Sequence, residues 1–305
     1  MEILFVSSGN TKNGISPIVF NQGNSLQKIG HDVSFFTIKG KGVKGYFKHI
    51  FLLKKSLRNK KYDVVHAHYS LSAIVAALAG VRPLVVSLMG SDVKASPFFK
   101  YLIKTCHLLF WKKVIVKSED MKTSCGINNA SVLPNGVDFN KFRRIPRKEA
   151  LQVTGWPSDK KHILFAANPK RREKNFDLAL RAFSLIRNNN IQLQVLEDVP
   201  NQEMPAYFNA ADVILLTSLW EGSPNVIKEA MACDCKIVAV DVGDIKDIIQ
   251  DTEGCFVTSF EEIEVADALI KALEYPEKPQ GRLQIQHLNE ENIAARLTDL
   301  YQQVL

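Results

Sequence analysis

Hydrophobic and polar residues follow two alternating patterns along the whole chain. Short apolar runs rich in Val, Ile and Phe predict buried strands, and apolar residues at every third or fourth position predict amphipathic helices. The predicted strands are residues 3–6, 32–36, 63–66, 84–88 and 113–116 in the first half, and 162–166, 192–196, 212–216 and 236–240 in the second. Because strands that alternate with helices build βαβ units, we expect an α/β protein with open parallel sheets.

The helical pattern is clearest near the two ends of the chain. Ser16 is a typical N-cap residue, Pro17 suits the first helical position, and Gly30 is a typical helix stop. The last predicted helix carries a wide apolar stripe that consists of Ile293, Ala294, Leu297, Leu300, Tyr301 and Val304. A stripe of this width must pack against another part of the protein.

The length of 305 residues suits two domains. After Asn135 and Gly136 the pattern becomes irregular, and Pro146 and Gly155 bracket one short helical stretch, which we interpret as the linker between the domains. We therefore divide the chain into residues 1–150, 151–285 and a C-terminal helical segment, 286–305. Because open α/β sheets bind ligands at the carboxyl ends of their strands, we expect the active site in a cleft between the two domains.

The composition excludes several other classes of protein. Hydrophobic residues make up 46% and charged residues 23%, which are globular values rather than those of a disordered chain. No apolar run approaches the ~18 residues that a membrane span requires, and the first eight residues read as a buried strand rather than a signal peptide. The five cysteines have no metal-ligand spacing and are expected to be buried thiols. We expect a cytoplasmic protein.

Charge is divided unevenly between the two halves. Residues 1–150 hold 24 Lys and Arg against 8 Asp and Glu, a net +16, whereas residues 151–305 hold 15 against 24, a net −9. Residues 44–61 contain seven of the basic residues around an apolar face of Tyr46, Ile50, Leu53 and Leu57. This helix either has an ordinary solvated basic face or lies against an anionic membrane, where each cation contributes about 1 kcal/mol.

The segment most informative about chemistry is residues 211–232. A strand is expected to end near Ser218, a turn with Glu221 follows, and a helix starts at about Ser223 with Pro224 as its first residue. The backbone N–H groups of a helix start favour a phosphate. Glu229 lies in the second turn, about 9 Å farther along the axis. The two carboxylates either hold the two ends of an extended ligand, or Glu221 only favours the helix dipole and Glu229 is a surface residue.

This segment resembles the Glu-seven residues-Glu motif of the retaining glycosyltransferases of family 4, also called glycosyltransferase group 1. Shorter matches follow in the family's order and cover nearly the whole chain: Gly30–Val33, Asp63–His68, Gly90–Asp92, Lys117–Glu119, Val132–Asp138 with Phe142, and Lys174–Asn175. The resemblance implies the GT-B fold, in which two Rossmann-like domains face a cleft. Residues 1–150 would bind the acceptor, residues 151–285 the nucleotide sugar, and residues 286–305 would return to the first domain.

The resemblance also implies roles for individual residues of the second domain. Glu221 would contact the donor sugar, Glu229 the ribose hydroxyls and Lys174 the diphosphate, with Arg171 as a substitute for the family's usual arginine. The helix start would complete the donor site through Ser223, Pro224, Asn225 and Val226. Cations and helix amides placed in this way stabilise a departing diphosphate without a metal ion.

Three residues of the first domain are implied to take part, and each has a structural alternative. Gly14 would let the diphosphate or acceptor approach, or is a plain turn glycine. His68 and Asp92 would contact the reacting groups, or are a structural histidine and a helix cap. The chain departs from the family's pattern at three positions, namely Pro169, Met89 and Asp244.

The expected reaction is the transfer of a sugar from a nucleoside diphosphate to a hydroxyl of a glycan or lipid-linked acceptor, as in bacterial surface polysaccharide synthesis. No cofactor or metal is expected, since no Asp-x-Asp stands on a strand-end loop. A nucleotide-sugar epimerase or a phosphorylase is the nearest alternative, and a basic scaffold that binds anionic lipid or nucleic acid is the alternative without catalysis. No nucleic-acid motif supports the last partner, so nucleic acid is not expected.

Overall fold

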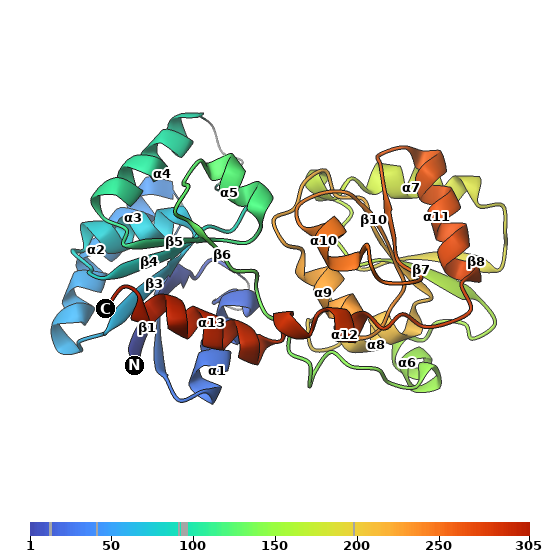
Figure 1. The fold of residues 1–305 in the computed structure, drawn as a ribbon, viewed down its shortest axis with the longest axis horizontal. Helices are drawn as coiled ribbons and strands as arrows, with labels where there is room; N and C mark the ends of the chain where they lie inside the picture. Colours follow the sequence, from blue (N-terminus) through green and yellow to red (C-terminus); the bar gives the residue numbers. More distant parts are fainter. Residues whose placement is uncertain (12–13, 41, 91, 93–96, 198) are drawn as a thin grey trace. The chain divides into compact units, whose positions relative to one another are not determined.

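A computed structural model of residues 1–305 describes all of the chain except residues 12–13, 41, 91, 93–96 and 198. For residues 42–44, 97 and 98 it describes the backbone alone. The chain forms two compact units, Met1–Gly136 with Glu290–Leu305, and Val137–Asn289 (Figure 1). Both units are built from parallel strands and helices, so the predicted α/β class with two open sheets is confirmed.

The first unit contains a six-stranded parallel sheet with the order β2-β1-β3-β4-β5-β6. Its strands are β1 Glu2–Ser8, β2 Asp32–Ile38, β3 Val64–His68, β4 Leu84–Ser87, β5 Lys113–Val116 and β6 Ser131–Val132. Its helices are α1 Pro17–Lys28, α2 Gly42–Asn59, α3 Ser70–Leu78, α4 Pro97–Leu109, α5 Glu119–Cys125 and α13 Glu290–Gln302. All five predicted strands are present, and β6 is an addition too short to show a pattern.

Helices cover both faces of this sheet (Figure 1). One face buries Leu53 of α2 and Ile103 of α4 in a core shared with α3, and the apolar face of Tyr46, Ile50 and Leu57 packs against this core. The other face is covered by α1 and α13, which contact each other. Helix α13 therefore returns to the first unit, and the apolar stripe predicted for it is buried at Ile293, Ala294, Leu297 and Tyr301.

The second unit contains a five-stranded parallel sheet with the order β11-β10-β9-β7-β8. Its strands are β7 Lys161–Phe165, β8 Ile191–Val195, β9 Val213–Leu216, β10 Ile237–Val240 and β11 Phe256–Thr258. Its helices are α6 Arg147–Thr154, α7 Phe176–Leu185, α8 Met204–Ala210, α9 Asn225–Ala232, α10 Ile245–Ile249, α11 Glu262–Glu274 and α12 Gly281–Gln284, with 3-10 turns at Arg172–Lys174 and Gln286–Leu288.

The segment interpreted as a linker belongs to the second unit. Helix α6 begins after Pro146 and ends at Gly155 as expected, but it packs along α8. Arg147 donates hydrogen bonds to both carboxylate oxygens of Asp212 at 3.0 and 3.1 Å, at the entrance to β9. The boundary between the two units consequently falls between Gly136 and Val137, whereas the division predicted from the sequence was at residue 150.

Candidate active site

Lys174 and Glu221 form an ion pair at the carboxyl edge of the sheet in the second unit. Their Nζ and Oε1 atoms are 2.6 Å apart, and the two side chains are 14% and 15% exposed. Lys174 stands in the loop after β7 and Glu221 in the loop after β9, and these strands are parallel neighbours. A pair with this little water around it holds both side chains more firmly than a surface pair does.

Hydrogen bonds between the same two loops fix the backbone that carries Lys174. The Thr217 hydroxyl lies within 3.1 and 2.9 Å of the carbonyl oxygens of Lys174 and Asn175. The backbone N–H of Leu219 donates to the Glu173 carbonyl at 2.9 Å. The position of the lysine therefore depends on the end of β9 as well as on its own 3-10 turn.

Helix α9 points its first turn toward the same edge. It begins at Asn225 with Pro224 as the N-cap, one position later than the sequence predicted, because Pro224 has an extended backbone. The first N–H groups of a helix have no partner within it, so they favour an anion. The Ser218 hydroxyl and the Asn225 side-chain oxygen are buried, and neither finds a hydrogen-bond partner among the described residues. Such atoms in a native site are usually satisfied by ligand or water.

The loop after β10 presses against the turn that carries Glu221. Gly243 has φ +67°, and a Cβ atom there would lie 2.7 Å from the Gly222 carbonyl oxygen and 3.0 Å from that of Glu221. Only glycine combines this backbone conformation with this approach. The departure Asp244 follows directly and is buried.

Asp244 interacts with a charged group of α9 and a polar group of the turn before it. Burial raises the pKa of its carboxyl to about 6, while the hydroxyl of Ser223 and the ammonium of Lys228 favour the charged form. Lys228 is fully buried, and burial lowers its pKa to about 8 although Asp244 and Glu229 oppose that change. The departure from the family's pattern is thus accompanied by a buried opposite charge on the neighbouring helix.

Glu229 lies one residue farther along α9 and is held by a second set of contacts. The Asn201 amide donates a hydrogen bond to its Oε1 atom at 3.2 Å, and the Lys141 ammonium donates to the Asn201 side-chain oxygen. Burial raises the pKa of Glu229 to about 7, with Asn201, Lys141 and Lys228 acting in the opposite direction. Glu229 is therefore not a plain surface residue.

The other predicted cation, Arg171, is engaged locally. Its guanidinium pairs with Glu173 of the same turn at 2.5 Å, and its side chain is 58% exposed. Lys170 pairs with Glu197 at 2.8 Å. The Asn168 side-chain oxygen accepts a hydrogen bond from the Lys170 N–H. This bond shapes the loop around Pro169, where the chain departs from the family's pattern. Of these cations, Lys174 is the one that the structure places beside Glu221.

In the first unit the three predicted residues lie at or after the carboxyl ends of parallel strands. Gly14 lies after β1 with φ +81° and donates its N–H to the Thr11 carbonyl. Asp92 is fully buried and accepts hydrogen bonds from the N–H groups of Ser70, Met89 and Gly90 at 2.9 to 3.1 Å. Asp92 therefore caps α3, the helix before it in the chain, and shapes the turn of the departure Met89, whereas the structural alternative predicted from the sequence was a cap of the following helix.

His68 is the last residue of β3 and is buried. Its ring stacks on His66 with 4.3 Å between the centroids and contacts Phe5. Burial and the nearby Lys117 lower the pKa of His68 to about 3, so the ring is neutral at pH 7. A neutral ring does not supply a proton to a leaving group, although it can still form a hydrogen bond to a ligand.

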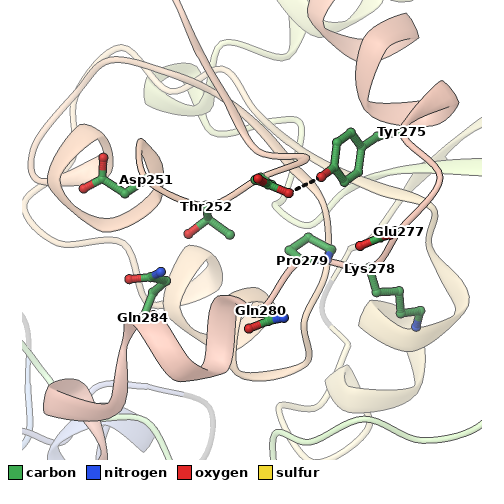
Figure 2. A pocket seen from close by; sticks show the side chains of 9 residues that line it. Asp251, Thr252, Tyr275, Glu277, Lys278, Pro279, Gln280 and Gln284 are labelled. Atoms are coloured by element: carbon green, nitrogen blue, oxygen red, sulfur yellow. Dashed lines mark hydrogen bonds between the residues drawn. The ribbon is translucent and has the colours of Figure 1, made fainter.

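A separate pocket of the second unit lies away from these residues. Figure 2 shows it between the segment after α10, with Asp251 and Thr252, and the segment after α11, with Tyr275 and Lys278. None of the predicted site residues lines it. Helices α10 and α11 both end at this pocket, on the edge of the sheet opposite to the carboxyl ends of the strands.

Three residues near the candidate site were not predicted from the sequence: Lys141, Asn201 and Lys228. Lys141 stood in the supposed linker, and Asn201 in an irregular stretch after β8. Lys228 carried a usable signal, because a lysine among Val226, Ile227 and Ala230 on a helix that covers a sheet is expected to be buried with a partner.

The comparisons with known proteins match both units of this fold. The family Glycosyl transferase 4-like matches residues 11–118, and the family Glycosyl transferases group 1 matches residues 190–275. The chain belongs to the group 1 glycosyltransferases. Its predicted family and GT-B fold are confirmed, and Glu221 and Glu229 lie within the second matched region.

Two relatives and one solved structure illustrate this glycosyltransferase assignment. TuaC of Bacillus subtilis (strain 168), whose name gives it a provisional role in teichuronic acid biosynthesis, is 26% identical over 61% of this chain and 55% of its own length. The Escherichia coli UDP-Gal:alpha-D-GlcNAc-diphosphoundecaprenol alpha-1,3-galactosyltransferase is 25% identical over 74% and 69%. Anabaena Alr3699/HepE, solved in complex with UDP-glucose, has a TM-score of 0.78 at 16% identity and covers 99% of this chain and 100% of its own.

Within the described residues, no helix combines the length and hydropathy needed to cross a membrane. The same residues contain no group of three His, Cys, Asp or Glu side chains arranged to hold a metal ion.

Proposed function

We propose that this chain is a retaining glycosyltransferase that moves a sugar from a nucleoside diphosphate, bound on the second unit, to a hydroxyl of a glycan or lipid-linked acceptor. The observation that carries the proposal is the low-exposure pair of Lys174 and Glu221 in front of the first turn of α9. The cation and the helix N–H groups suit the negatively charged diphosphate of a nucleotide sugar. The carboxylate at the same strand edge suits the sugar, whose hydroxyls donate hydrogen bonds.

The proposed roles follow from the charge of each group. Lys174 and the first turn of α9 stabilise the negative charge that develops on the departing diphosphate. Glu221, held by Lys174, accepts hydrogen bonds from hydroxyls of the donor sugar. Glu229, deeper along α9, accepts those of the ribose. The complex of HepE with UDP-glucose supports a nucleoside diphosphate sugar as the donor class.

We place the reaction in the retaining class, as implied by the Glu-seven residues-Glu motif of this family. Attack then occurs on the face of the sugar that the diphosphate leaves, the bond from the anomeric carbon to the phosphate oxygen breaks, and the acceptor proton passes to that leaving oxygen. This scheme needs no enzymic nucleophile, and the neutral ring of His68 agrees with it.

The surface of the first unit supports the proposal that the acceptor lies at an anionic membrane surface. Helices α2, α3 and α4, which cover one face of its sheet, contain no Asp or Glu in their sequences. Phe51 on α2 and Tyr101 on α4 are 75% and 71% exposed, and basic residues including Lys54 and Lys104 share these outer surfaces. Exposed aromatic rings among cations suit a bilayer interface. The diphosphoundecaprenol acceptor named for the E. coli relative is a lipid of this kind.

Donor binding and transfer test the proposal directly. Nucleoside diphosphates are screened by thermal shift, and the matching labelled donor sugar is incubated with lipid-linked and soluble glycan acceptors. We expect a glycosylated product that keeps the anomeric configuration of the donor and forms in the presence of EDTA. An epimerised donor, a sugar phosphate, or loss of transfer on chelation that Mg²⁺ restores would contradict the corresponding part.

Two variants separate the proposed roles of the carboxylates. Glu229→Ala is expected to weaken nucleotide binding, and Glu221→Ala to lower turnover mainly, since a lost charged hydrogen bond costs about 1.5–3 kcal/mol. Glu262→Ala, which removes an exposed partner of Arg181 on the same unit, is the control. Equal nucleotide affinity of the wild type and Glu229→Ala would refute the ribose assignment.

Vesicle sedimentation tests the membrane part separately. Binding to phosphatidylglycerol vesicles should be strong at low salt and fade as salt screens the charges over about 8 Å. Phe51→Ser with Tyr101→Ser should weaken it, and Ile263→Ser, an exposed apolar residue of the second unit, should not. No binding at low salt would leave a soluble acceptor as the better proposal.

The side chain of Lys44, which is part of the predicted basic face, lies outside the described residues.

A further inference from the structure

A chain of three polar side chains connects the start of the second unit to Glu229. The ammonium of Lys141 donates a hydrogen bond to the side-chain oxygen of Asn201, and the amide of Asn201 donates one to Glu229 Oε1 at 3.2 Å. All three side chains are partly buried. They come from three separate segments of one compact unit, so only the tertiary structure brings them together.

The backbone around Lys141 is anchored on both sides. Asp138 accepts hydrogen bonds from the N–H groups of Asn140 and Lys141 at 2.9 and 3.1 Å. The guanidinium of Arg282 donates to the carbonyl oxygens of Phe139 and Phe142 at 2.9 and 2.8 Å. The Lys141 ammonium also lies 4.8 Å from the centroid of the Phe142 ring. These contacts hold the backbone of Lys141 in place, so they also restrict the position of its ammonium group.

The two ends of the chain determine how the amide of Asn201 is oriented. Its oxygen must face the ammonium, which only donates, and its N–H₂ must face the carboxylate, which only accepts when ionised. Reversing the amide would place donor against donor and acceptor against acceptor. Asn201 therefore fixes Glu229 in one orientation, and Lys141 fixes Asn201.

We propose that Lys141 and Asn201 are positioning residues for nucleoside recognition, which hold the Glu229 carboxylate ready for the two hydroxyls of a ribose. This inference rests on the proposed function, because it takes the ligand of Glu229 to be a ribose. The two residues act through Glu229 and contact no phosphate. Their effect is therefore confined to ligands that carry ribose hydroxyls.

A pair of nucleotides isolates this effect. Binding of UDP and of 2′,3′-dideoxy-UDP is measured by calorimetry for the wild type, Lys141→Met and Asn201→Ala; GDP and its dideoxy analogue are used if the thermal screen selects guanine. Each variant should lose about tenfold in affinity for UDP, the usual size for one hydrogen bond. Affinity for the dideoxy nucleotide should stay that of the wild type, and Lys141→Arg should restore much of the loss.

Lys160 provides the matched control. It is also bonded to an asparagine, Asn190, at 3.2 Å in the same unit, but at the amino end of β7. Lys160→Met should leave both affinities unchanged. Equal losses for UDP and the dideoxy nucleotide in Lys141→Met would indicate a direct phosphate contact and overturn the proposal, as would no loss for either. A wild-type protein that binds no nucleoside diphosphate would instead overturn the proposed function.

Discussion

The candidate site contains two charged residues that are removed from water. Lys228 is fully buried, Asp244 nearly so, and each favours the charged form of the other. A buried pair of opposite charges contributes little net stability, but removing one member leaves an uncompensated charge. The two residues should therefore tolerate joint replacement far better than single replacement.

We predict that Lys228→Met and Asp244→Gly each lower the free energy of unfolding by about 3 kcal/mol, because each leaves the other charge buried. The double variant should recover most of that loss. Urea denaturation of the four proteins gives the coupling energy. Additive losses in the double variant would show that the two charges do not interact.

The pKa of Glu229, raised to about 7 mainly by burial, predicts how donor binding depends on pH. The ionised carboxylate accepts hydroxyl hydrogen bonds more strongly than the protonated carboxyl does, so affinity should rise as pH increases through about 7 and level off above it. UDP-glucose is a suitable probe, because its esterified diphosphate does not titrate in this range. A flat affinity between pH 5.5 and 8.5 would contradict this role.

The same pKa predicts the effect on stability with the opposite sign. A carboxyl whose pKa is raised on folding stabilises the folded state only while it is protonated, and this stabilisation is lost as pH rises from about 4.3 to 7. Glu229→Gln should therefore stabilise the protein at pH 8 more than at pH 5, while weakening donor binding. Such a trade between stability and binding is usual in functional sites.

At the scale of elements, the ends of three parallel strands build the site. The loops after β7, β9 and β10 supply Lys174, Glu221 and Gly243, and hydrogen bonds and close backbone contacts tie these loops together. The position of Glu221 is thus set by its neighbours in the sheet as well as by its own turn.

We predict that Gly243→Ala lowers both stability and turnover. Its Cβ would meet backbone oxygens of the Glu221 turn, and its φ of +67° is strained for any other residue, at a cost of about 1–3 kcal/mol. Gly155→Ala is the control, because Gly155 has φ +69° with nothing near its Cβ. If the two variants lose the same activity, the contact with the Glu221 turn has no role.

At the scale of the whole molecule, the chain leaves the first unit at Gly136 and re-enters it at Glu290. Helix α13 is attached there by buried polar contacts as well as by its apolar stripe. The Tyr301 hydroxyl lies 2.7 Å from His66 Nδ1, and the other nitrogen of His66 lies 2.9 Å from the Ser87 hydroxyl. The first unit therefore depends on both ends of the chain.

We predict that Tyr301→Phe destabilises the protein by about 1–3 kcal/mol, because it leaves a buried ring nitrogen without its partner. Tyr101→Phe, at a site that is 71% exposed, should have no measurable effect. Nucleotide affinity should be unchanged in both, since the donor site is proposed on the second unit. Urea denaturation and calorimetry check these outcomes, and equal stability of the two variants would contradict the first.

Much of the fold could be predicted from local patterns in the sequence. All nine predicted strands are present, because buried parallel strands leave short apolar runs in the sequence and the helices between them leave a helical period. Strands β6 and β11, with two and three residues, carry no measurable period and were not predicted. The spacing of Glu221 and Glu229 also follows from the sequence, since both flank the start of a single helix.

What only the tertiary structure decided is which distant residues meet. The sequence treated Lys174 and Glu221 as separate signals, and strand order placed their loops together. It treated residue 141 as part of a linker, whereas packing placed Lys141 in a chain that ends at Glu229. Side-chain contacts of this kind depend on strand order and helix packing, which no local pattern encodes. The sequence therefore determined the elements and the kinds of charge available, and the fold determined which charges act together.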